Sequence, residues 1–569
     1  MNRQYNVRLF FIGAFLFLGY AIIIASLFVI QIYRASFFSN LGKKQYDVTI
    51  TQTPPRATIF DRNGVPLTLN KDSFAAFTMP KKLEDEKSLK NFLKRHYKEA
   101  YKKLTSTDPS YFMYIKRRLT PEQRTQIEKA ALKDLYILNE PTRFYPLLAA
   151  APVIGLTDID NRGVVGLELM HNEQLAGTPS VFSLQRDARS GSFYFERETK
   201  VQGSLGTPIT TTIDSTLQFL VYEAVHDSVT TFTAKEGAAL IMDPVKGDIL
   251  AMVSVPCFDP NQTESLDLDE AKNRPITEVY ELGSVIKAFL ALAALEEGVV
   301  TPDEMIDCED KFTTYVEGRR VNTARTTNAG IIPFTTVIRK SNNIGVAKVA
   351  LRVGEKLYDY YRRLGFGSKT GVKFPGEREG FVNPPKSWSK QSILSLSYGY
   401  EINCSLLQLA RAFGMIATEG FDVHPRLLLT NSSAGQKERL FSSASCRQLK
   451  EILTSEKPLP GNIKPYIEGI RIGTKTGTAN ILINGHYDET KNLYTCAGFV
   501  EKDSYQRIIV VFIKESAHKR LLASQVAAPL FQDIAQKLVI HDKVVRDIAP
   551  KEVVRNIQPS IVTQEVIIS

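Results

Sequence analysis

At 569 residues the chain is too long for one compact core, so we expect two or three domains. Its composition, 43% hydrophobic and 23% charged, is ordinary for a folded protein. The formal net charge of +10 arises mostly between residues 81 and 133, where 15 Lys and Arg accompany 7 Asp and Glu in helix-like sequence. Such a stretch is typical of a solvated, charged helical face, and we therefore assign no nucleic-acid partner.

The first element is an uncharged stretch from residue 9 to residue 33, bracketed by Arg8 and Arg34. About 20 apolar residues cross a membrane, whereas a cleavable signal peptide has an apolar run of roughly 7–15 residues. We therefore expect a retained transmembrane anchor in the cytoplasmic membrane. By the positive-inside rule, residues 1–8 lie in the cytoplasm and everything from about residue 34 lies outside.

Residues 49 to 78 predict strand and turn, with a strand around Ile59 and a turn at residues 61–64. Basic helical sequence follows to about residue 135, and a second extended region, broken by glycines, runs from 143 to 178. We interpret residues 34–203 as an elongated mixed domain, a pedestal on the membrane.

Residues 210 to 218 pass from a β-branched strand into a helix and open a second domain, which we place at residues 204–540. We expect the remaining residues, 541–569, to form a strand or a loose tail. The five cysteines are scattered and odd in number, so they form no disulfide framework, and at least one thiol stays unpaired. The absence of Cys-x-x-Cys or clustered histidines predicts no metal site, and we expect no cofactor.

A serine nucleophile needs a base beside it, and Ser-x-x-Lys on a helix places hydroxyl and amine on one face. Only the pair at residues 284 and 287 precedes a long apolar helix, residues 288–295, that can bury the lysine and lower its pKa. The serine also stands where the helix begins, which favours developing negative charge. We interpret the other two pairs as chance; the three pairs are Ser284/Lys287, Ser387/Lys390 and Ser516/Lys519.

Two further motifs follow in order. Ser341-Asn342-Asn343 precedes an amphipathic helix; alone, such a triplet is usually a helix cap. Lys475-Thr476-Gly477-Thr478 lies among small residues that suit a strand lining a site, with residues 495–499 as its partner strand. Lys369-Thr370-Gly371 repeats three of these letters in a glycine-rich turn, and we interpret it as a decoy.

Ser-x-x-Lys, Ser-x-Asn and Lys-Thr-Gly in this order form the signature of penicillin-binding proteins and serine β-lactamases. The chain resembles class B penicillin-binding proteins from about residue 50 to residue 535. It departs from their pattern at Leu282, where the family has proline, and at Ala57, where it has glycine. Pedestal and transpeptidase segments that carry the resemblance are residues 53–64, 143–146, 163–168, 175–177, 365–367, 374–377 and 397–402.

The resemblance implies an α+β fold: a transmembrane helix, a pedestal, and a transpeptidase domain with an antiparallel sheet flanked by helices, as in serine β-lactamases. It implies Ser284 as nucleophile, Lys287 as general base, and Ser341 with Lys475 as a proton relay. Asn343 would bind the donor peptide amide. Lys475, Thr476, Gly477 and Thr478 would bind the substrate carboxylate, and the Ser284 and Thr478 N–H groups would form an oxyanion hole.

The implied function is a peptidoglycan D,D-transpeptidase that cross-links stem peptides and is acylated by β-lactams. Residues 166–168, 175–177 and 186–187 favour the septal branch over the elongation branch. A D,D-carboxypeptidase, a β-lactamase and a non-catalytic penicillin sensor or scaffold remain as alternatives. We find no glycosyltransferase domain, so we expect a glycosyltransferase and other cell-wall synthesis or division proteins as partners.

Overall fold

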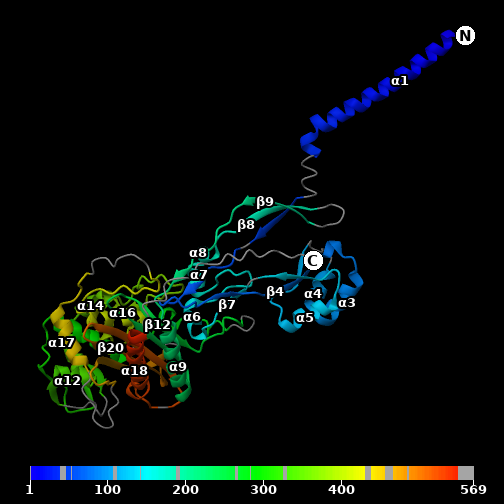
Figure 1. Cartoon of the computed structure of the whole chain (residues 1–569). Coiled ribbons are helices and arrows are strands. Elements are labelled where there is room, and N and C mark those ends of the chain that lie inside the picture. Colours follow the sequence, from blue (N-terminus) through cyan, green and yellow to red (C-terminus); the bar gives the residue numbers. More distant parts are fainter. Residues whose placement is uncertain are drawn as a thin grey trace. The chain divides into compact units, whose positions relative to one another are not determined.

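The computed structural model describes residues 2–38, 47–52, 54–106, 112–140, 142–186, 193–262, 267–281, 283–323, 330–429, 438–454, 465–483, 486–518 and 520–548. Contacts divide the chain into two units: residues 1–57 with 173–207, and residues 58–172 with 208–569. Figure 1 shows the elements of both units.

The first unit contains the apolar N-terminal helix and a small sheet. The apolar segment Tyr5–Tyr33 is 29 residues long, with a mean hydropathy of 2.5 over its most apolar stretch, which is long and apolar enough to cross a membrane. The sheet is antiparallel in the order β1-β8-β9. Its elements are α1 (Asn2–Phe28), η1 (Val29–Tyr33), β1 (Asp47–Gln52), β8 (Ser180–Arg186) and β9 (Phe193–Val201).

The second unit begins with a helical subdomain on a three-stranded sheet, β5-β4-β6. Leu89, Leu93 and Ile127 from its helices pack on Ala76 and Ile115 of the sheet. The sequence predicted helix here, and the strand β5 is a correction. The bounds are β4 (Phe74–Thr78), α3 (Glu86–His96), α4 (Lys98–Leu104), β5 (Met113–Lys116), α5 (Pro121–Ala130) and β6 (Tyr136–Asn139).

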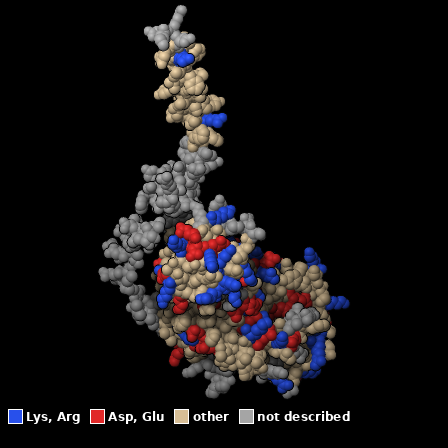
Figure 2. Space-filling model, turned by 90° about the vertical axis from the view of Figure 1, so that its right-hand side faces the viewer, with Lys and Arg blue, Asp and Glu red and all other residues tan. Residues whose placement is uncertain are grey.

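The helices of this subdomain carry the charge surplus on exposed side chains that form local ion pairs. Lys90 pairs with Glu86 at 2.6 Å and Arg124 with Glu128 at 2.7 Å, each one helical turn apart. On the face shown in Figure 2, lysine and arginine side chains are interspersed with aspartate and glutamate. The sequence-based interpretation as a solvated, charged helical face is confirmed for these helices.

The stretch from 143 to 178 contains one short strand followed by single helical turns, which corrects the predicted extended region. Its apolar runs are too short for periodicity to distinguish strand from helix. Arg143 and Glu168 form a buried ion pair at 2.8 Å that joins the strand to the second turn. The elements are β3 (Leu69–Lys71) paired with β7 (Thr142–Phe144), then α6 (Ala151–Ile154), α7 (Gly166–Met170) and α8 (Asn172–Ala176).

A five-stranded antiparallel sheet, in the order β12-β11-β21-β20-β19, forms the centre of the C-terminal part. The predicted passage from strand to helix near residue 214 is confirmed, and Asp214 caps the helix by accepting a hydrogen bond from Leu217 N–H at 3.0 Å. The strands of this sheet are β11 (Ala234–Met242), β12 (Ile249–Val255), β19 (Arg471–Ile483), β20 (His486–Lys502) and β21 (Tyr505–Ser516). A separate parallel pair is formed by β2 (Ile59–Phe60) and β10 (Ile209–Thr210).

Helices cover both faces of this sheet (Figure 1). α9 (Ser215–Thr231) and α18 (Ala523–Ile548) pack on one face, where Val221, Phe531 and Val511 share a core. α16 (Leu406–Ala417) packs on the other face. The expected α+β fold with a helix-flanked antiparallel sheet is confirmed. Further helices on that side are α10 (Arg274–Thr277), η5 (Gly283–Ile286), α11 (Lys287–Glu296), α12 (Phe334–Arg339), α13 (Asn343–Val353), α14 (Lys356–Arg363), α15 (Ser392–Tyr398) and α17 (Ser443–Leu453).

α18 continues to Ile548, beyond residue 540, so the first residues of the predicted tail are helical. His541 on this helix lies 3.4 Å from Asp214, the cap of α9. Hydrogen bonds to Asp214 and Asp542 raise the pKa of His541 to about 9. This contact ties the end of α18 to the start of α9, while residues 549–569 of the predicted tail lie outside the described residues.

Candidate active site

The predicted nucleophile lies in a turn that is held by backbone contacts on two sides. Ser284 is the second residue of η5, which runs directly into α11. Gly283 has a φ of +53°, and a Cβ there would lie 2.8 Å from the Thr478 carbonyl oxygen on β19. A Cβ on Gly399, the residue after α15, would lie 2.2 Å from the Gly283 carbonyl oxygen. Glycine alone fits both positions, so the turn is fixed against β19.

Lys287 is fully buried and follows Ser284 by one helical turn. Its Nζ donates hydrogen bonds to the Ser341 carbonyl oxygen at 2.8 Å, to Ser341 Oγ at 3.2 Å and to Asn343 Oδ1. Burial lowers the pKa of Lys287 well below its ordinary value, and the nearby charge of Lys475 lowers it further. A neutral amine still donates two hydrogens and has a lone pair that can accept a proton.

The Ser341 hydroxyl lies between the two lysines. Lys475 Nζ donates to Ser341 Oγ at 3.1 Å and to the Thr476 carbonyl oxygen at 3.0 Å, and the lysine is only 5% exposed. Ser341 has a φ of +56°, which is uncommon for a residue other than glycine and is often found at functional sites. A continuous set of polar contacts therefore runs from Lys287 through Ser341 to Lys475.

In the triplet at residues 341–343, one residue caps a helix and the other two contact Lys287. Asn342 caps α13, because its side chain accepts a hydrogen bond from Gly345 N–H at 2.9 Å. The next side chain, Asn343, reaches Lys287, and its Nδ2 donates to the Asn322 carbonyl oxygen at 2.6 Å. The cap interpretation thus holds for the middle residue, and the outer two residues lie beside the buried lysine.

β19 carries the third motif at the edge of the described sheet, with the predicted partner strand confirmed by the pairing of Lys475 with Ala497 and Thr476 with Cys496. Thr476 and Gly477 follow Lys475 directly along the strand. Thr478 Oγ1 accepts a hydrogen bond from Ala523 N–H at 3.0 Å, so its hydroxyl proton is still available to a ligand.

The structure therefore places Lys287 in contact with Ser341 and Asn343, and Ser341 in contact with Lys475, beside the turn that carries Ser284. Within the described ranges, the Ser284 hydroxyl makes no hydrogen bond to another residue. No group of three His, Cys, Asp or Glu side chains in those ranges is arranged to hold a metal ion.

The other Ser-x-x-Lys pairs lie elsewhere. Ser387 and Lys390 are exposed, and Ser387 ends a short 3-10 helix. Ser516 ends β21, and Lys519 lies outside the described residues, as does Leu282, which replaces the family proline. All five cysteines are unpaired.

Two contacts at the site were missed by sequence reasoning. The Asn322 carbonyl oxygen accepts a hydrogen bond from Asn343 and orients it. Every residue has a backbone carbonyl, so the sequence cannot indicate which one makes this contact. The ring of Tyr398 lies 5.9 Å from Lys287 Nζ and adds a cation–π contact when the amine is charged. Tyr398 belongs to the segment 397–402, whose family resemblance was the available signal.

A helix-flanked antiparallel sheet with a serine turn, two lysines and an asparagine in contact is the arrangement of serine enzymes that recognise penicillin. Residues 237–536 match the family described as "Penicillin binding protein transpeptidase domain", and residues 51–211 match "Penicillin-binding Protein dimerisation domain". The chain belongs to the penicillin-binding protein family, with a transpeptidase domain preceded by a dimerisation domain.

Relatives agree with this family, and a solved structure shares the fold. The chain is 30% identical to the "Probable peptidoglycan D,D-transpeptidase PenA" of Neisseria meningitidis, covering 92% of this chain and 91% of that protein. It is 29% identical to the "Peptidoglycan D,D-transpeptidase FtsI" of Escherichia coli K12, covering 84% and 82%. Penicillin binding protein 3 from Mycobacterium tuberculosis, complexed with aztreonam, shares the fold with a TM-score of 0.66 at 24% identity, covering 87% of this chain and 98% of that one.

Proposed function

We propose that this protein is a membrane-anchored peptidoglycan D,D-transpeptidase that works through a serine acyl-enzyme. The observation that carries the proposal is the contact of Lys287, Ser341, Asn343 and Lys475 beside the turn of Ser284. The chemistry requires a hydroxyl nucleophile, a base of lowered pKa and a cation for the substrate carboxylate. These three groups are present in one place.

In the first half-reaction the Ser284 hydroxyl attacks the carbonyl carbon between the two D-alanines of a donor stem peptide. Neutral Lys287 takes the hydroxyl proton as the Oγ–C bond forms. The C–N bond to the last D-alanine then breaks, and its amine receives a proton through Ser341, which contacts both Lys287 and Lys475. The Ser284 and Thr478 N–H groups stabilise the oxyanion, a contact worth about 3 kcal/mol of barrier.

In the second half-reaction the amine of a neighbouring stem peptide attacks the acyl carbon. The new C–N bond replaces the ester to Ser284, and the proton released by the amine restores the serine hydroxyl. Asn343 holds the donor amide during both steps, while Lys475, Thr476, Gly477 and Thr478 bind the carboxylate of the leaving D-alanine. β-Lactams acylate Ser284 in the same way because they imitate the D-alanyl-D-alanine end.

The proposal includes the location and the domains expected from the sequence. α1 and η1 would anchor the chain in the cytoplasmic membrane through residues 9–33, with residues 34–203 and 204–540 outside as pedestal and transpeptidase domains. The apolar helix and the match to the dimerisation domain support this arrangement. A protease added to intact spheroplasts should digest the large domains and leave an anchor fragment; full protection would contradict this orientation.

Labelled penicillin tests the acyl-enzyme. The purified protein should form a stable one-to-one adduct at Ser284, and Ser284→Ala should form none, with Ser387→Ala as a matched control that labels like the wild type. Rapid loss of the label to water would instead indicate a β-lactamase or a D,D-carboxypeptidase. Normal cell-wall synthesis by Ser284→Ala in cells lacking the wild type would indicate a non-catalytic sensor or scaffold.

Within this activity we propose the septal role over the elongation role, supported by the resemblance of residues 166–168, 175–177 and 186–187 to the division branch; residue 187 lies outside the described residues. A separate glycosyltransferase would supply the glycan strands. A fluorescent fusion should gather at mid-cell during division, whereas a lateral-wall pattern would support elongation.

A further inference from the structure

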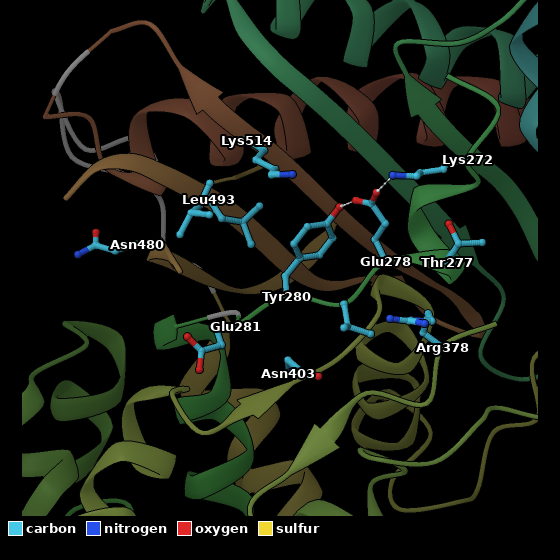
Figure 3. Close-up of a pocket in the computed structure, with 12 residues that line it drawn as sticks. Lys272, Thr277, Glu278, Tyr280, Glu281, Arg378, Asn403, Asn480, Leu493 and Lys514 are labelled. Atoms are coloured by element: carbon cyan, nitrogen blue, oxygen red, sulfur yellow. Dashed lines mark hydrogen bonds and ion pairs between the residues drawn. The ribbon is translucent and has the colours of Figure 1, made fainter. Parts of the chain in front are cut away.

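Two lysines beside the serine turn are paired with carboxylates. They line a cavity of about 680 Å³ that adjoins this turn, and Figure 3 shows both of them. Lys272 pairs with Glu278 at 3.2 Å, and Lys514 pairs with Glu236 at 3.1 Å. The ring of Tyr280 lies 5.6 Å from Lys514 Nζ and adds a cation–π contact to the ion pair. Each of these ammonium groups therefore has an anionic partner.

Lys287 differs from these two lysines. Its Nζ contacts three neutral oxygen atoms, those of the Ser341 carbonyl, the Ser341 hydroxyl and the Asn343 amide. Within the described ranges no carboxylate contacts this amine, and the charge that acts on it, that of Lys475, is repulsive. The proposed mechanism nevertheless turns Lys287 into an ammonium each time it takes the proton of Ser284. Because a buried charge without a partner is costly, this ammonium needs a further stabilising contact.

The ring of Tyr398 is placed to make this contact. Its centroid lies 5.9 Å from Lys287 Nζ, within the range of a cation–π interaction. The ring packs against a small core that includes Val321, Ile344 and Leu394, and its hydroxyl is buried without a hydrogen-bond partner among the described residues. Burial raises the pKa of this hydroxyl, so the side chain stays uncharged at neutral pH. Any effect of Tyr398 on the lysine therefore comes from its ring.

Two contacts hold the ring in place relative to the serine turn. Tyr398 is the last residue of α15 and precedes Gly399, which lies against the Gly283 carbonyl oxygen. Arg319, from a neighbouring hairpin, donates a hydrogen bond to Ser395 Oγ at 2.7 Å, one turn earlier in α15. The Arg319 guanidinium lies 6.0 Å from the same ring and is the other charged group that faces it. The ring is thus fixed from both ends of the helix that carries it.

We propose that Tyr398 is a positioning residue of the reaction, whose ring receives the ammonium that forms when Lys287 takes the Ser284 proton. The proton moves from Ser284 Oγ to the lone pair of Lys287 Nζ as the Oγ–C bond forms, and it passes on toward the leaving amine through Ser341. The ring stabilises the charge in between, and it brings no permanent negative charge that would keep Lys287 protonated between turnovers. This inference rests on the proposed function, because it requires Lys287 to act as the base for Ser284.

Fluorinated phenylalanines test the ring with little change in its shape. Phenylalanine and its singly and multiply fluorinated derivatives are incorporated at position 398 of the full-length protein in detergent, and Tyr398→Phe serves as the reference. Fluorine withdraws electron density from the face of the ring and weakens its attraction for a cation. Stopped-flow labelling with benzylpenicillin, from acid to alkaline pH, gives the acylation rate of each protein.

We expect acylation on the alkaline plateau to slow with each added fluorine, by roughly tenfold for the most fluorinated ring, the size of one desolvated cation–π contact. The acid limb should move to lower pH by roughly one unit, because a less stabilised ammonium releases its proton more readily. The two effects oppose each other on the acid side, so the rates should converge there. A ring that serves only for packing would slow the reaction by the same factor at every pH.

The same fluorinated residues at Phe366 provide the matched control. Phe366 is a fully buried ring of the same domain, and its ring contacts are with Phe289 and Tyr361. Fluorination there should leave both the plateau and the acid limb unchanged. A shift of the limb at this position as large as at Tyr398 would show that the effect does not come from the contact with Lys287.

The failures of the two proposals are distinguishable. If penicillin does not label Ser284 of the wild type, the proposed function is wrong. If penicillin labels Ser284 but fluorination at Tyr398 does not move the acid limb to lower pH, or slows acylation equally at every pH, the proposed function stands and the role of the ring is wrong.

Discussion

Two segments of the transpeptidase domain share the letters Lys-Thr-Gly and differ in nearly everything else. Lys475 lies on the edge strand β19, is buried and contacts Ser341. Lys369 lies in a turn, where the neighbouring Thr370 donates both its N–H and its hydroxyl to Glu377 Oε1 at 2.6 Å. Gly371 then has a φ of +88°, which suits a turn.

The difference shows that a motif acts through the element that carries it. On a strand, the side chains of alternate residues point to opposite faces, so Lys475 can reach the half-buried Ser341 while the strand edge stays open to a ligand. In the turn, the threonine hydroxyl is used by the fold itself, because Glu377 holds it. The first segment is therefore expected to govern the reaction, and the second to govern stability.

The largest effect should come from removing the lysine of each segment. Lys475→Ala should slow acylation by benzylpenicillin on the order of 100- to 1000-fold, the range for losing an electrostatic contact in an active site. Lys369→Ala is the matched control and should stay within about twofold of the wild type. Stopped-flow labelling of equal amounts of folded protein measures the acylation rates of both variants. Equal losses of rate in the two variants would contradict the different roles of the two lysines.

A second, smaller effect concerns pH. Below its lowered pKa, Lys287 is protonated and cannot take the Ser284 proton, so the acylation rate should fall about tenfold per pH unit on the acid side and level off well below pH 10.5. Lys475→Ala removes one of the two causes that lower this pKa, so the acid limb should move to higher pH. Rates measured from pH 5 to 10 test this, with Lys369→Ala keeping the wild-type limb. An unmoved limb in Lys475→Ala would show that the two lysines are not coupled.

The smallest effect should distinguish the two threonines. Thr476→Val should slow acylation roughly tenfold, for the loss of one hydrogen bond to a charged group, and leave the free energy of unfolding unchanged. Thr370→Val should do the reverse: it should cost about 1 kcal/mol of folding stability, since Glu377 keeps only the N–H donor, and leave the acylation rate unchanged. Urea unfolding and penicillin labelling measure the two quantities, and a shared effect on both would refute the division of roles.

The residues now found together at the site were predictable because each one belongs to a short motif, and the order of the three motifs is specific. The strand at Lys475 with its partner, and the helix after Asn343, followed from local patterns of small and apolar residues. Sequence could separate the two Lys-Thr-Gly segments because glycine-rich sequence around Lys369 predicts a turn.

The cavity beside the site was beyond sequence reasoning, since its walls come from residues near 280, 378, 403, 480 and 514 that only the tertiary fold brings together. The helical end of α18 was missed for a similar reason. A long-range contact between His541 and Asp214 stabilises the end of this helix. Local composition cannot predict contacts between residues so far apart in the sequence.

The backbone contact between Gly399 and Gly283 has a consequence for how the protein can change under antibiotic selection. Neither position has room for a single methyl group, so a substitution at either one has to shift the turn that carries Ser284. We therefore expect substitutions that weaken antibiotic binding to arise at surrounding positions that admit other side chains rather than at these two glycines.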